Sequence, residues 1–179
     1  ASLIPSELKA DTLIKMYRYK LTTAFMRQVY DNVTINLDHI FALTLYYHPE
    51  DSIHLHELTA RVYKNIKSVQ EMEKYRMHPS MQLDVFKVLS GKKLKAWASV
   101  MDLAKEQGII KGGSGVEFLE IDHKALEDEH EFHNIRLHNL LRVHINEMLL
   151  LDDVIKTIKK NAKASHEQIG EDIFETLYK

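Results

Sequence analysis

The chain has 179 residues, of which 45% are apolar and 28% are charged, and its formal net charge is −2. This balance excludes a wholly disordered chain, because enough apolar surface is available to offset the chain entropy lost on folding. The small net charge gives no general attraction to nucleic acid or anionic lipid, and the absence of cysteine excludes disulfide and thiolate chemistry. No apolar run has the length of a membrane span. We therefore expect a globular cytoplasmic protein.

The first two predicted elements are helices, and long helices are expected because only six glycines and three prolines interrupt the chain. Ser6 can cap a helix that continues to about Tyr30 and carries apolar residues at helical spacing. Asn36 can cap a second helix over 37–47, which Pro49 ends. This second helix is apolar on almost every side, so we expect it at the centre of the fold.

Three further helices lead to a β-hairpin, and they are predicted over 55–70, 81–89 and 92–107, with a polar connector over 71–80. Gly108 is suited to the C-cap of the last helix, because glycine adopts the left-handed conformation at low cost. Strand-like residues then flank the turn Gly112-Gly113-Ser114-Gly115, which predicts a hairpin over 109–121. The order helix, helix, helix, hairpin resembles a winged helix.

The rest of the chain is predicted to be helical, over 122–151, 152–160 and 165–178, with Ser165 and Gln168 at capping-box spacing. The expected fold class is mainly α: a multi-helix domain with one small β-hairpin in a winged-helix-like arrangement, followed by C-terminal helices. Residues 1–121 would form the helical domain that ends in the hairpin. The C-terminal helices of 122–179 would pack on it within one continuous domain.

Eleven histidines are the first candidates for a metal site. If 122–151 is one helix, His130, His133 and His144 lie within about 60° of one another, and Glu127 precedes His130 at the Glu-x-x-His spacing of di-iron bundles. A di-iron site needs a second such motif, which the sequence lacks. His144 is also too far along the helix from His133 for one ion to bridge them. We therefore predict no metal and no cofactor, and expect these histidines to be hydrogen-bonded or exposed.

Two shorter histidine patterns have ordinary interpretations. His54 and His56 would place their rings together only in a strand, and the helical period around them puts both at the start of a helix. His123 and Asp128 have the His-x4-Asp spacing with which glycerolipid acyltransferases deprotonate an acceptor hydroxyl. They sit in an acidic stretch without a phosphate-binding segment, so no catalytic residue is predicted.

The residues of the predicted helix before the hairpin indicate whether this helix would read DNA or pack against the core. It begins with Lys92, Lys93 and Lys95, but it continues with Trp97 and Met101. A DNA-reading helix exposes basic and amide side chains, whereas this one has the apolar face of a packing helix. Specific nucleic-acid binding is not expected. A winged-helix-like regulatory or protein-interaction module, with nucleic acid as one partner class, is kept as the alternative function.

Two stretches within Val33 to Val143 carry a family resemblance. The first is Val33-Thr-Ile-Asn with its apolar helix, followed by Ile53-His-Leu-His-Glu-Leu58; the second crosses the hairpin to Phe132-His-Asn-Ile-Arg-Leu-His138. They resemble the region after the catalytic domain in bacterial membrane-associated glycerol-3-phosphate acyltransferases, whose second stretch is an aromatic-Arg-Asn-Asn-x-x-His helix. Asn134 and His138 fall on the family's Asn and His, whereas His133 and Ile135 depart from its pattern.

The resemblance implies a non-catalytic C-terminal accessory domain of a phospholipid-synthesis acyltransferase, which transfers an acyl group to glycerol 3-phosphate or a related acceptor. The parent protein would be an enzyme, but the family's catalytic motifs lie upstream of this region, so the chain alone is not expected to be active. Its implied partner is the catalytic domain of the same polypeptide, with the parent peripheral on the inner membrane. Asn134 and His138 are then candidate interface residues, and a solvent-facing His138 stays open.

Overall fold

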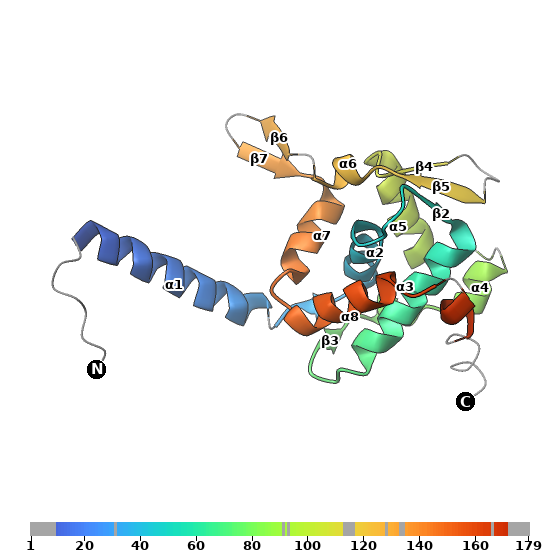
Figure 1. The fold of residues 1–179 in the computed structure, drawn as a ribbon, viewed down its shortest axis with the longest axis horizontal. Helices are drawn as coiled ribbons and strands as arrows, with labels where there is room; N and C mark the ends of the chain where they lie inside the picture. Colours follow the sequence, from blue (N-terminus) through green and yellow to red (C-terminus); the bar gives the residue numbers. More distant parts are fainter. Residues whose placement is uncertain are drawn as a thin grey trace.

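The fold is built around α2 (Leu37–Tyr46), the helix whose side chains are apolar on almost every side. All its side chains from His39 to Leu45 are buried. It packs against four other helices, α3 (Leu55–Gln70), α5 (Lys95–Glu106), α7 (Leu140–Met148) and α8 (Asp152–Ala162), and Figure 1 shows it at their centre. The computed structural model describes residues 10–30, 32–90, 92, 94–112, 117–127, 129–132, 135–165 and 167–171. The central position predicted for helix 37–47 is confirmed.

A reciprocal cap fixes where α2 begins. The Asn36 side chain accepts a hydrogen bond from the backbone N–H of His39 at 3.0 Å, and Nδ1 of His39 accepts one from the backbone N–H of Asn36 at 3.1 Å. This is a capping box in which histidine replaces the usual Glu or Gln at the third helical position. The cap satisfies two backbone donors and also fixes the orientation of the His39 ring.

A three-stranded antiparallel sheet completes the winged-helix-like arrangement that the sequence predicts. The strand β2 (Ser52–His54) lies between α2 and α3, and the hairpin strands β4 (Ile110–Lys111) and β5 (Phe118–Ile121) follow α5. The sheet order is β2-β5-β4, so β2, which lies between α2 and α3, pairs with β5, the second strand of the hairpin. Side chains alternate between buried and exposed along β5, as expected when one face of a sheet covers a core.

The segment after α3 is tied back to the start of α2 by two short strands. The strands β1 (Thr34–Ile35) and β3 (Arg76–Met77) pair in parallel. A 3₁₀ turn, η1 (Pro79–Met81), and the short helix α4 (Val85–Leu89) follow. The predicted helix over 81–89 is therefore too long, because Asp84 caps α4 by accepting from the Lys87 N–H at 3.1 Å.

The predicted continuous helix over 122–151 is wrong. The helix α6 (His123–Glu127) is short, and the antiparallel strands β6 (Glu129–Phe132) and β7 (Ile135–His138) follow before α7 begins. The strand register sets Glu129 opposite His138 and Glu131 opposite Arg136. This register is a property of two strands taken together, and a helical period in the sequence cannot express it.

The C-terminal helices cover the side of α2 and α3 that the sheet leaves open. Asn139 caps α7 by accepting from the Arg142 N–H at 2.7 Å, and it also donates to the Ala125 carbonyl. The helix α7 packs on α2, and α8 packs on α3. Ser165 caps the next helical turn by accepting from the Gln168 N–H at 3.2 Å, as predicted.

The N-terminal helix α1 (Ala10–Tyr30) extends away from this body of packed helices (Figure 1). Its apolar stripe is exposed instead of packed; Leu21 and Phe25 are each 68% exposed, and the stripe also contains Ile14, Tyr17 and Val29. The predicted cap at Ser6 lies outside the described residues. Among the described helices, none has the length and apolar content required to cross a bilayer.

The burial of α2 gives a direct stability prediction at Phe41. Its ring is fully buried and meets the Trp97 ring edge to face, with 5.6 Å between centroids. Phe41→Ala should therefore lower the free energy of unfolding by about 3–5 kcal/mol, measured by urea denaturation. Phe86→Ala, at a ring that is 57% exposed, is the matched control and should change stability by about 0.5 kcal/mol or less. A Phe41→Ala cost near that of the control would contradict a central α2.

Candidate functional site

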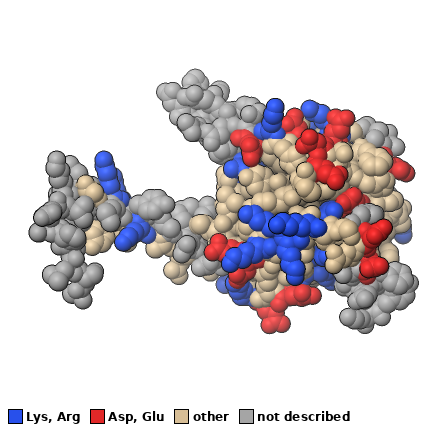
Figure 2. Space-filling view, viewed as in Figure 1, with Lys and Arg blue, Asp and Glu red and all other residues tan. Residues whose placement is uncertain are grey.

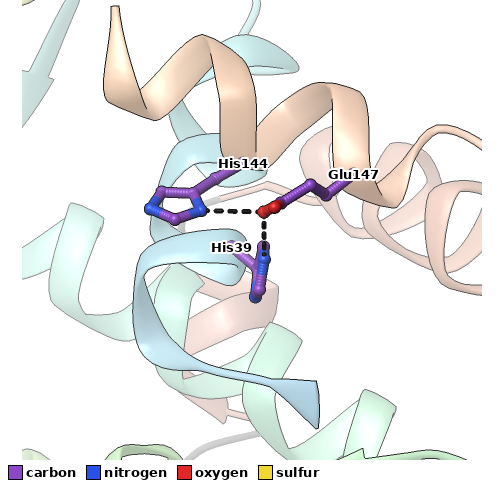
Figure 3. A group of neighbouring side chains, drawn as sticks. All are labelled: His39, His144 and Glu147. Carbon is purple, nitrogen blue, oxygen red and sulfur yellow. Dashed lines mark hydrogen bonds and ion pairs between the residues drawn. The ribbon is translucent and has the colours of Figure 1, made fainter. Parts of the chain in front are cut away.

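The most concentrated group of chemically active side chains joins α2 to α7. Figure 3 shows His39 from α2 and His144 and Glu147 from α7 pointing toward one another. Nε2 of His39 lies 2.8 Å from Oε2 of Glu147, and Nδ1 of His144 lies 3.0 Å from the same oxygen. The two imidazole rings meet edge to face at 4.9 Å. One carboxylate oxygen of Glu147 therefore accepts hydrogen bonds from two histidines, one on each helix.

The cap of α2 determines the tautomer of His39. Its Nδ1 accepts from the Asn36 N–H, so that nitrogen carries a lone pair and the ring proton of the neutral form sits on Nε2. That Nε2–H donates to Glu147, which accepts a second hydrogen bond from Nδ1–H of His144. All three hydrogen bonds are satisfied with the two histidines neutral and Glu147 ionised.

Burial and hydrogen bonding set the charges in this cluster. Burial lowers the pKa of His39, and the hydrogen bond to Glu147 only partly opposes that effect. For Glu147, burial alone would raise the pKa, but the hydrogen bonds from His144 and His39 outweigh it and hold the pKa of this carboxyl below its usual value. Neutral His39 beside ionised Glu147 is thus the stable pair near neutral pH.

Two histidines and a glutamate are also a ligand set that zinc uses, and the three ligand atoms lie within 4.8 Å of one another. A metal on Nε2 of His39 would require Nδ1 to carry the proton, because metal-bound histidines donate from the other ring nitrogen. That proton would point at the Asn36 N–H, which already donates to Nδ1. The cap and a metal ion therefore compete for one ring, and the geometry fits a hydrogen-bonded connector better than a metal centre.

The remaining chemistry of the cluster is that of a carboxylate that orients an imidazole. Glu147 fixes His144 through Nδ1 and leaves its Nε2 as an acceptor, which is the arrangement of a general base. A base needs a substrate within reach, and the hollows at Arg61, at His123 and at Gln82, in the described part of the chain, do not include this cluster. We assign the cluster a structural role, the connection of α7 to α2.

A second polar group is buried between α2, α3 and α8. Asn65 donates to Thr44 at 3.0 Å and accepts from Asn161 at 2.8 Å. Arg61 pairs with Glu57 at 2.7 Å and donates to backbone carbonyls at the end of α8, those of Asn161, Ala162 and Ala164. These bonds tie the C-terminal end of α8 to the body of the protein.

A small cavity of about 10 Å³ lies within that polar group, and His48 lines it. The His48 side chain is 6% exposed; its Nε2 donates to the Ser52 carbonyl at 3.2 Å, and its Nδ1 has no partner among the described protein atoms. Burial lowers the pKa of His48. The volume is that of a single water molecule, so the cavity is too small for an organic substrate.

The residues singled out for acyltransferase chemistry are not assembled into a site. His123 begins α6, and its Nε2 lies 3.2 Å from the Glu50 carbonyl and 3.9 Å from the Asp51 carboxylate, in an open hollow of about 520 Å³. Asp128, the other half of the His-x4-Asp pair, lies outside the described residues. His54 ends β2 and caps α3 by accepting from the His56 N–H at 3.1 Å, so both residues lie at the start of a helix as predicted. Their rings nevertheless meet edge to face with 5.1 Å between centroids, so the expectation that only a strand would bring them together is wrong.

Of the two candidate interface residues, His138 lies on a strand and not on the predicted helix, which corrects its predicted placement. His138 is the last residue of β7, and Asn134 lies outside the described residues between β6 and β7. His130 is on β6 and His144 is on α7, so these two histidines do not share the helical face on which the sequence placed them, and His133 lies outside the described residues. The interface role of Asn134 and His138 stays a prediction.

Sequence reasoning singled out His144 but paired it with the wrong partners. Two local signals for the observed cluster are present in the sequence. His39 stands three residues after the cap Asn36, and Glu147 stands three residues after His144. The contact between the two pairs joins residues 108 positions apart, which no local pattern predicts.

Comparison with known proteins gives no match to this chain among family models, curated proteins or solved structures.

The low pKa of His39 predicts how stability depends on pH. The unfolded chain binds a proton near pH 6.5 while folded His39 resists it, so this contribution is complete above pH 6.5 and is lost as the pH falls. The urea midpoint should fall between pH 7.5 and pH 5.5. His39→Gln, which keeps a capping-box residue, should fall less over the same interval. Equal slopes for the wild type and His39→Gln would refute the role given to His39.

The competition between cap and metal predicts a small response to zinc. Addition of Zn²⁺ at one to ten equivalents should change the Tm by about 1 °C or less, measured by calorimetry, because coordination would break the Asn36 cap. A rise of several degrees that disappears in both His144→Ala and Glu147→Gln would show instead that the cluster is a metal site.

Proposed function

We propose that this chain is a non-catalytic accessory domain that docks on a larger catalytic protein through α1. The exposed apolar stripe of α1 carries the proposal. Leu21 and Phe25 are the most exposed members of this stripe, which also contains Ile14, Tyr17 and Val29. A contiguous exposed apolar patch marks a site of interaction with another molecule. Burial of each large exposed side chain would contribute about 1.5–3 kcal/mol to docking.

The family resemblance supplies the identity of the proposed partner. It supports the catalytic domain of a glycerol-3-phosphate acyltransferase on the same polypeptide, with the assembly peripheral on the inner membrane. Figure 1 shows α1 and the β6–β7 hairpin extending from the same side of the body, so one partner could contact both. The strand β7 ends at His138, which matches the family's His, whereas Asn134, which matches its Asn, lies outside the described residues.

A winged-helix protein-interaction module is the second candidate, and the sheet order β2-β5-β4 favours it. In that arrangement α5 is the helix that would read DNA. Its outward stripe contains Lys95, Ser99, Asp102 and Glu106, all exposed. Two carboxylates on this stripe repel phosphate, so the observations favour a protein partner over nucleic acid.

The proposal is tested by changing α1 in the polypeptide that joins this chain to the catalytic domain. Leu21→Ser with Phe25→Ser should lower acyl transfer from an acyl thioester to glycerol 3-phosphate by about tenfold or more, the scale of one lost apolar contact. The same pair of changes in the 179-residue chain should leave its urea midpoint unchanged, because α1 is exposed there. The isolated chain should show no acyl transfer.

Phe86→Ser with Phe118→Ser is the matched control, because both rings are similarly exposed on other elements. If the α1 and control variants behave alike, α1 is not the docking element. If the polypeptide that carries this chain transfers no acyl group at all, the acyltransferase assignment is wrong and the interaction module replaces it.

A further inference from the structure

The outer face of α8 carries four lysines in one stripe. Lys156, Lys159, Lys160 and Lys163 follow the i, i+3, i+4, i+7 spacing, which places them within about 100° of the helix circumference and along about 10 Å of its length. All four are exposed, whereas Val154, Ile155 and Ile158 on the opposite face are buried. In Figure 2 the Lys and Arg side chains gather over α8, and acidic residues lie around this group.

The lysine stripe is only partly opposed by acidic side chains of the protein. Over the described part of the chain, none of its four ammonium groups forms a salt bridge with a carboxylate, although the charge of Lys156 acts on Asp153 one turn earlier. Lys159 lies over the Tyr47 ring, 5.0 Å from its centroid, which holds this charge at the surface without cancelling it. The two acidic residues of α8, Asp152 and Asp153, are confined to its first turn. A local positive surface therefore exists on a chain whose net charge is −2.

The composition of the stripe distinguishes between anionic partners. Protein interfaces are enriched in arginine and aromatic side chains and depleted in lysine, so an all-lysine stripe is a poor match for an acidic protein. A stripe about 10 Å long meets about three phosphates on one strand of a duplex, fewer than the roughly six to ten that give firm binding. Flexible lysines on a convex helix can instead reach a plane of anionic head groups together, and each contributes roughly fivefold to partitioning.

We propose that the lysine stripe of α8 faces an anionic lipid surface. The inference rests on the peripheral membrane location in the proposed function and names the surface responsible for it. It does not require α1, whose apolar stripe is assigned to the protein partner. The attraction is electrostatic, so it should weaken steeply with salt and vanish on uncharged lipid.

The test is co-sedimentation of the full 179-residue chain with vesicles of phosphatidylcholine, alone or with phosphatidylglycerol, at 50 and 500 mM NaCl. The chain should bind only the vesicles that contain phosphatidylglycerol and should be released by high salt. Lys160→Glu with Lys163→Glu should weaken binding at least about tenfold, since two attractive charges become repulsive. Lys105→Glu with Lys124→Glu makes the same change in net charge at exposed lysines on other elements and should alter binding by less than about twofold.

Equal losses in the two double variants would overturn the proposal, because net charge alone would then explain binding. The proposal would also be overturned if the wild-type chain, with a fold shown intact by circular dichroism, did not bind the vesicles. Tighter binding to a 20-base-pair duplex than to vesicles at equal salt would overturn it as well. Acyl transfer by the joined polypeptide in detergent is a separate readout. Vesicle binding without that activity would contradict the acyltransferase assignment and support the lipid-binding face of α8. Activity without vesicle binding would support the acyltransferase assignment and contradict the lipid-binding face.

Discussion

The burial of α2 is the constraint on which the rest of this structure depends. A ten-residue helix with apolar side chains on nearly every side cannot lie at a surface, so other elements must enclose it. The winged-helix elements α3 and α5 cover part of it, and α7 and α8 cover the remainder. Because those elements come from distant parts of the chain, the helix also determines which segments meet.

The same burial explains why the polar side chains of α2 act as connectors. A buried polar group is costly unless it is hydrogen-bonded, and each polar side chain on the inner faces of α2 has partners. His39 joins its own N-cap to Glu147 of α7, and Thr44 accepts from Asn65 of α3. The capping box that starts α2 also fixes the tautomer of His39, and this is why a ligand set of two histidines and a glutamate is better explained as a hydrogen-bonded connection than as a metal site.

Sequence patterns predicted the parts of the fold that depend on local periodicity. Local patterns in the sequence predicted helices α2 and α3, the caps at Asn36 and Ser165, and the hairpin after Gly108. Each of these features is encoded by residues only a few positions apart. The β6–β7 hairpin was missed because a strand pair is defined by a register between two segments, here Glu129–Phe132 against Ile135–His138, which a helical period cannot express. The connection of His39 to Glu147 was missed because only the folded chain brings those residues together.

The central claim is that α2 holds the winged-helix elements and the C-terminal helices in one cooperative unit. Native-state hydrogen exchange measures this directly, because each amide reports the free energy of the opening that exposes it. Amides in the middle of α2, α3, α7 and α8 should exchange with one common opening free energy, equal to that of global unfolding. If α7 and α8 exchanged through openings several kcal/mol less costly while α2 and α3 stayed protected, the C-terminal helices would be a separate unit and α2 would not be the element that joins them.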